Sequence, residues 1–162
     1  YEAAARAALP HEAGLVEHPA LYPWGTEAPA CAEVAIGRFQ RTQQPAGTPS
    51  GLCDSEPEGA VEVQSMPRDR SLQGVYDLTG NLGEWVQDQY SPSYPACAEP
   101  CRDPLYDPPH RPDWEPARVR RGGGWLLLPV DARATSRSGT PADTPLTGFG
   151  VRCVLSARPA SP

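Results

Sequence analysis

Proline and glycine interrupt this chain so often that long regular elements have little room to form. Its 162 residues include 21 Pro and 15 Gly, and residues 11–70 contain almost no long periodic stretch. Proline fixes φ and removes a backbone donor, while glycine loses more entropy on ordering than any other residue. The sequence therefore predicts a loop-rich α+β domain with little regular secondary structure.

Short regular elements are expected at three places. Residues 1–9 (YEAAARAAL) are Ala-rich and stop at Pro10, which indicates the end of a helix that begins before residue 1. Residues 117–128 (ARVRRGGGWLLL) and 151–159 (VRCVLSARP) have the composition of short strands. The long irregular part needs another source of order, and disulfides and bound cations are the expected ones.

Length and charge exclude several classes of function. A chain of this length suits one domain. The formal net charge of −6 opposes nucleic-acid binding, which needs clustered positive charge. The longest apolar run, WLLLPV at residues 125–130, is too short to cross a membrane.

Five cysteines are the clearest sign of covalent order. Cys31 and Cys53 bracket a loop rich in Gly, Pro and Gln, and Cys97 and Cys101 bracket Ala-Glu-Pro. A zinc site is the competing interpretation, but a C-x3-C without a second close pair lacks the usual ligands. Two disulfides are the favoured prediction, with Cys153 left over, and they indicate a secreted, periplasmic or cell-surface protein.

The segment YDLTGNLGEW combines turn-forming residues with two carboxylates. Asp77 and Glu84 flank Gly80, Asn81 and Leu82, so carboxylates and backbone carbonyls can surround a single point. Such a set of hard oxygen ligands suits calcium. The alternative is an ordinary turn in which Asp77 and Asn81 accept hydrogen bonds from backbone amides.

The order of four motifs resembles the formylglycine-generating-enzyme, or sulfatase-modifying-factor, family. The motifs are YPWG (22–25), GVYDLTGNLGEWVQDQY (74–90), RVRRGGGW (118–125) and GVRC (150–153), preceded by a helix-like YEAAAR (1–6). The resemblance implies a variant of the C-type-lectin fold. It spans residues 1–157 as the later part of a truncated family domain and leaves residues 158–162 as a tail or linker.

The resemblance also favours the calcium interpretation of the turn. The positions that match the family's ligands are Asp77, Gly80, Leu82 and Glu84, with a structural role for the ion. A second calcium turn would follow Cys31, but residues 32–53 contain no Asn or Asp. In the family's closing motif some members carry a disulfide cysteine, so Cys153 is expected to pair with a cysteine upstream of residue 1.

Enzymes of this family oxidise a sulfatase cysteine to formylglycine with oxygen, using copper on two thiolates shortly after the strand that resembles RVRRGGGW. Soft thiolates suit Cu(I). Here no cysteine occurs between Cys101 and Cys153, and apolar residues 126–128 and Ala132 stand in that neighbourhood. We therefore expect no copper and a catalytically inactive, calcium-stabilised module that binds a protein or glycan ligand. The alternative is a formylglycine-generating oxidase, or a related oxygen-dependent oxidoreductase, with a sulfatase substrate.

A groove is a further expectation around the glycine-rich segment. Trp125, Arg133 and Arg137, with Arg121 nearby, have the composition to line a site for an acidic or carbonyl-bearing ligand. The competing prediction is that these arginines brace loops by donating to carbonyls. Residues 122–124 (GGG) are expected to allow close backbone approach rather than to hold phosphate.

Overall fold

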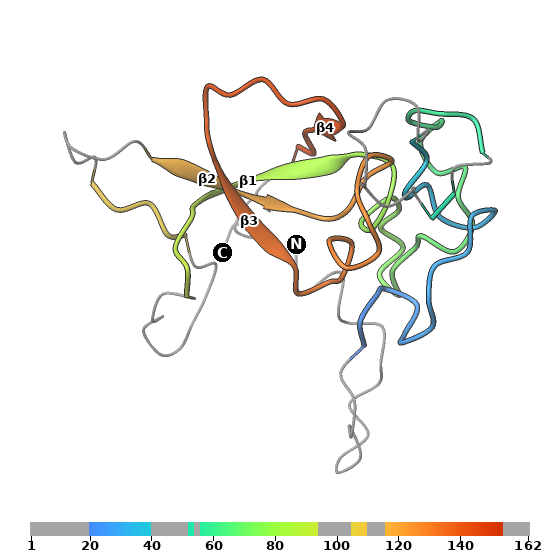
Figure 1. Ribbon diagram of the computed structural model, residues 1–162. Coiled ribbons are helices and arrows are strands. Elements are labelled where there is room, and N and C mark those ends of the chain that lie inside the picture. Colours follow the sequence, from blue (N-terminus) through green and yellow to red (C-terminus); the bar gives the residue numbers. More distant parts are fainter. Residues whose placement is uncertain (1–19, 40–51, 54–55, 94–104, 110–115, 154–162) are drawn as a thin grey trace, which may run out of the picture.

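The computed structural model describes residues 20–39, 52–53, 56–93, 105–109 and 116–153. Four strands, β1 (Gly83–Gln89), β2 (Ala117–Arg121), β3 (Arg137–Pro141) and β4 (Phe149–Gly150), form one sheet in the order β3-β2-β1-β4. β2 is antiparallel to β1 and β3, whereas β4 is parallel to β1, so the sheet is mixed. Figure 1 shows these strands beside a large irregular region formed by the earlier part of the chain.

The loop-rich architecture agrees with the sequence prediction, but the α+β class is only partly supported. Within the described residues there are strands and no helix. The helix expected at residues 1–9 lies outside them. No described helix is long and apolar enough to cross a membrane.

The strand predicted for residues 117–128 is too long. β2 ends at Arg121, and Gly122 follows with a φ of +74°. Gly123 then donates to the Thr79 carbonyl at 2.8 Å, and a Cβ on Gly123 would lie 2.3 Å from that oxygen. The glycine segment therefore leaves the sheet because it packs against backbone, which is the close approach that its composition predicts.

The last predicted strand is also displaced. β4 covers only Phe149–Gly150, and residues 151–153 do not continue it. Phe149 pairs with Gly83, where a Cβ would meet the Phe149 ring at 2.3 Å. The pairing therefore depends on glycine at the start of β1. Residues 154–159 of the predicted strand lie outside the described residues.

The hydrophobic core lies mainly in irregular segments. Tyr22, Val34, Ile36 and Ala132 form one buried cluster, and Leu21 and Trp24 pack against it. The Cys31–Cys53 disulfide that the sequence predicts closes the neighbouring loop, with the two Cα atoms 5.4 Å apart. The Cys97–Cys101 pair lies outside the described residues.

Candidate functional site

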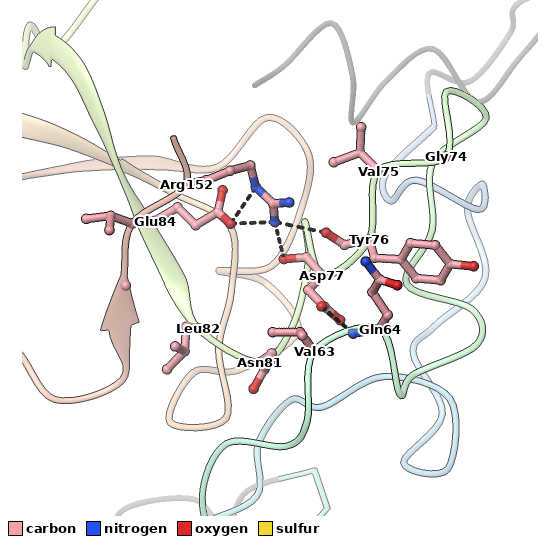
Figure 2. Close-up of a pocket in the computed structure, with 12 residues that line it drawn as sticks. Val63, Gln64, Gly74, Val75, Tyr76, Asp77, Asn81, Leu82, Glu84 and Arg152 are labelled. Atoms are coloured by element: carbon pink, nitrogen blue, oxygen red, sulfur yellow. Dashed lines mark hydrogen bonds and ion pairs between the residues drawn. The ribbon is translucent and has the colours of Figure 1, made fainter. Parts of the chain in front are cut away.

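A cavity of about 320 Å³ lies where the calcium-like turn meets the sheet. We call it the turn cavity. Its walls come from four separate stretches of chain (Figure 2), namely Val63, Gln64, Gly74, Val75, Tyr76, Asp77, Asn81, Leu82, Glu84, Gly150, Val151 and Arg152. Three of the four predicted calcium ligands, Asp77, Leu82 and Glu84, therefore line one cavity, whereas Gly80 is not among its lining residues.

Asp77 and Asn81 give the turn its shape. Both have a positive φ, 58° and 66°, a conformation that Asp and Asn tolerate better than other side chains. The Asp77 Oδ2 atom accepts from the Gln64 amide at 2.8 Å, and Asn81 Oδ1 accepts from the Val61 amide at 2.9 Å. The two side chains thus accept hydrogen bonds from backbone amides, as the simple-turn interpretation predicts, and attach the turn to residues 61–64.

The other oxygen of Asp77 has no such partner. Its Oδ1 atom is buried and accepts no hydrogen bond within the described part of the chain. A buried, unpaired carboxylate oxygen is costly. Asp77, which lines the turn cavity, therefore has one buried carboxylate oxygen without a partner among the described residues.

Arg152 pairs with the second carboxylate of the turn cavity, that of Glu84. Its guanidinium pairs with Glu84 Oε1, with Nε at 2.8 Å and Nη2 at 2.5 Å, and Nη2 also donates to the Tyr76 carbonyl at 2.9 Å. Figure 2 shows this guanidinium between Glu84 and the backbone of the turn. The charge of Glu84 is thus balanced by an internal cation that the sequence analysis did not single out.

Asp69 is a further residue that the sequence analysis missed. Its carboxylate is buried and accepts from the Thr79 amide at 3.0 Å and the Gly80 amide at 2.6 Å. Burial raises the pKa of Asp69 to about 6, although the amide hydrogen bonds act in the opposite direction. Asp69 therefore fixes the backbone of the turn at Thr79 and Gly80. Its setting between Arg68 and Arg70 in the sequence is typical of a surface charge.

Another cavity, of about 210 Å³, lies beside β2 and β3. We call it the sheet cavity, and its lining residues are Arg120, Gly122, Leu127, Asp131, Ser136, Arg137, Ser138 and Phe149. Of the predicted groove residues only Arg137 lines it. Arg133 is exposed and Trp125 is half-buried outside it.

Arg121 follows the bracing alternative. It is buried, and its guanidinium donates to the carbonyls of Ala134 at 2.8 Å and Ser136 at 2.5 Å. Arg137 is also engaged, because Nη1 donates to the Ser91 carbonyl at 2.6 Å and the guanidinium lies over the Tyr90 ring. These two arginines position loops around the sheet cavity.

Within the described residues, which do not include Cys97 and Cys101, the side chains do not fit a copper thiolate centre. Leu127 lines the sheet cavity, and Ala132 is buried in the core. Among the described residues Cys31 and Cys53 are joined to each other, and Cys153 is free and exposed. The same residues contain no group of three or more His, Cys, Asp or Glu side chains that could hold a metal ion. A calcium ion at the turn would therefore depend on Asp77, Glu84 and backbone carbonyls.

These features define a loop-rich, disulfide-linked domain on a small mixed sheet. It has a carboxylate-containing turn, and no thiol of the described residues lines the sheet cavity. The sequence profile described as sulfatase-modifying factor enzyme 1-like domain matches residues 1–157, and the chain belongs to this family.

Individual relatives include one that is named as inactive and one that is named as an enzyme. The chain is 25% identical over 143 residues to inactive C-alpha-formylglycine-generating enzyme 2 of Mus musculus, covering 85% of this chain and 37% of the relative. It is 34% identical over 87 residues to formylglycine-generating enzyme of Streptomyces coelicolor, covering 52% of this chain and 26% of the relative. The chain thus spans well under half of each of these relatives.

The fold is shared with a solved structure, that of PvdO from Pseudomonas aeruginosa. The TM-score is 0.54 at 23% identity, and the match covers 88% of this chain and 44% of PvdO. At this identity the likeness concerns the fold alone.

Proposed function

We propose that this chain is a catalytically inactive, calcium-stabilised member of the sulfatase-modifying-factor family that serves as a binding or scaffold module for a protein or glycan ligand. In this proposal the fold is a variant of the C-type-lectin fold. The observation that carries the inactive role is the sheet cavity, where Leu127 stands and no thiol of the described residues contributes to the lining. Leucine can neither bind Cu(I) nor release a proton at the metal.

The turn supports the calcium role. Asp77 presents a buried oxygen without a partner, and Glu84 lines the same cavity. Calcium accepts such carboxylates together with carbonyl oxygens, for which we propose Gly80 and Leu82. Because Arg152 pairs with Glu84, the ion and the guanidinium would compete for that carboxylate.

An extracytoplasmic location is part of the proposal. The Cys31–Cys53 disulfide supports it, because such bonds persist mainly in oxidising compartments. The mouse relative, which is named as inactive, supports a family role without oxidation.

Thermal unfolding with and without calcium tests the structural role of the ion. A ligand that binds only the folded state at about 100 times its Kd adds ~2.7 kcal/mol of stability. We expect calcium to raise Tm and EDTA to reverse the rise. In Asp77→Gly, where glycine accepts the positive φ, the rise should disappear.

Asp143→Gly is the matched control, since Asp143 is exposed and lies outside the turn cavity. This variant should keep the full calcium response. Equal Tm values in calcium and EDTA for the unmodified chain would contradict the calcium role.

A further inference from the structure

The sheet cavity contains a cationic side chain that the proposed calcium role leaves unused. Arg120 comes from β2, and its guanidinium lies over the Phe149 ring with Cζ 4.6 Å from the centroid. Its Nε atom is buried and has no hydrogen-bond partner within the described part of the chain. Stacking occupies the face of the guanidinium, so its N–H groups, which lie in the plane, stay available to an acceptor.

Arg137, in the same cavity, differs from Arg120. Its guanidinium already donates to the Ser91 carbonyl and stacks on Tyr90. Burial lowers the pKa of Arg120, with the charge of Asp131 acting in the opposite direction. A guanidinium that has lost hydration gains most from an anionic acceptor, and Arg120 is therefore the natural anchor for a ligand.

The surroundings of Arg120 select among anions. Asp131 lines the same cavity and repels negative charge, which disfavours a doubly charged phosphate more than a single carboxylate. A carboxylate has two oxygens that match the paired N–H groups of a guanidinium edge. Leu127 and Phe149 supply apolar contact for the body of the ligand, and Ser136 and Ser138 contribute hydroxyl groups.

Size sets a limit on the ligand. At about 210 Å³ the sheet cavity is smaller than the roughly 300–1,000 Å³ of pockets that enclose drug-sized molecules. It suits a few heavy atoms beside the carboxylate, which is the size of a short branched acid or of one terminal residue of a peptide.

We propose that the sheet cavity binds a monocarboxylate with a short apolar body, with Arg120 as the anchoring cation. This inference rests on the proposed binding role and names its ligand class. The same chemistry is present in a free short-chain acid and in the C-terminal residue of a peptide.

Calorimetric titration in acetate-free buffer tests the proposal with three probes: isovalerate, N-acetyl-Gly-Leu with a free carboxylate, and the carboxamide of that peptide. We expect at least one acid to bind and the carboxamide to bind at least tenfold more weakly than its acid. Binding of isovalerate alone would assign the site to a free acid. Binding of the peptide acid alone would assign it to a chain terminus.

Variants connect binding to the cavity. Arg120→Leu should weaken acid binding at least tenfold, whereas Arg133→Leu, a change of the same kind at an exposed arginine, should leave it unchanged. Asp131→Asn keeps an oxygen to accept from the Leu128 amide and removes the repelling charge, so it should tighten binding several-fold. A gain of affinity cannot result from misfolding.

Failure of this inference is distinguishable from failure of the proposed function. Absence of acid binding, or binding indifferent to Arg120→Leu and Asp131→Asn, in protein whose Tm still rises with calcium would overturn the carboxylate site alone. Formylglycine production from a sulfatase peptide would overturn the inactive role, whatever the acids do.

Discussion

The irregular region and the sheet of this domain differ in where they bury their side chains. The largest fully buried side chains all belong to segments without regular secondary structure, namely Ile36, Val34, Thr79, Asp69, Pro23 and Cys53. The strands are mostly half-buried, and Val119 is their one buried hydrophobic residue in the described core. Loops therefore build most of the core among the described residues.

The two regions also satisfy their polar groups differently. In the sheet, the backbone is paired by strand ladders such as Val119 with Gly139. In the irregular region, side chains replace the ladder, as when Asp69 accepts from the amides of Thr79 and Gly80. Single side-chain changes should therefore damage the irregular region more than the sheet.

The largest expected effect is loss of the disulfide. Cys31→Ser with Cys53→Ser removes a crosslink across 22 positions and should lower the free energy of unfolding by ~3 kcal/mol. Chemical denaturation measures it. Cys153→Ser, at an exposed thiol, should change stability by less than about 0.5 kcal/mol. If both changes lowered the free energy of unfolding equally, the disulfide would not be the source of order in the loops.

The pH dependence of stability should report on Asp69. The folded-state pKa of about 6 lies above the 3.8 of the free side chain, so the folded state holds the proton more tightly. Stability should be highest below pH ~4, fall by roughly 2–3 kcal/mol as the pH rises to ~6, and then level off for this group. Denaturation across this range in EDTA provides the measurement.

Asp69→Asn should flatten that fall, although it also weakens the hydrogen bonds to the turn. Asp143→Asn, at an exposed position, should retain the slope of the unmodified chain. An unchanged slope in Asp69→Asn would assign the titration to another group.

A matched pair of valines compares the two regions directly. Val34 is fully buried in the irregular core, while Val86 is half-buried on β1. Val34→Ala should cost about 2 kcal/mol through lost burial and a residual cavity, and Val86→Ala less than about 1 kcal/mol. Thermal or urea unfolding measures the loss of unfolding free energy in both variants. A larger loss in Val86→Ala than in Val34→Ala would place the core in the sheet.

The smallest effect is expected at the sheet surface. Arg118 on β2 pairs with Asp107 at 2.9 Å, and both side chains are partly exposed. The hydrogen bond from Gln89, followed by Arg118, lowers the pKa of Asp107. Asp107→Asn should nevertheless leave the unfolding free energy nearly unchanged, because solvent screens the pair. A loss comparable to that of Val34→Ala would show that this surface pair contributes more to stability than its exposure indicates.

Local chemistry made part of this structure predictable. Frequent Pro and Gly indicated loops, the spacing of Cys31 and Cys53 indicated a disulfide, and the glycines after Arg121 indicated a close approach of backbone. Each of these follows from residue type and near neighbours. Motif order also indicated the family, because several short patterns in one order are far more specific than any one of them.

Long-range contacts explain what the sequence did not reveal. The end of β2 depends on the Thr79 carbonyl, which receives the Gly123 amide from a distant part of the chain. Arg152 pairs with Glu84 across 68 positions of sequence. Asp69 is buried in the fold, although the residues next to it in the sequence give no sign of this burial. Arg120 has the sequence setting of an exposed strand residue. Its contact with the Phe149 ring and the burial of its Nε atom become visible only in the folded structure.

The most direct test of the inactive role is an oxidation assay on the native chain with its Cys31–Cys53 disulfide intact. The protein is supplied with Cu(I) and oxygen and incubated with a cysteine-containing sulfatase peptide, and the peptide is analysed by mass spectrometry. We expect the peptide cysteine to remain unconverted, since no thiol lines the sheet cavity in the described structure. Repeated turnover of that cysteine to formylglycine would contradict the inactive role and require a copper site elsewhere in the chain.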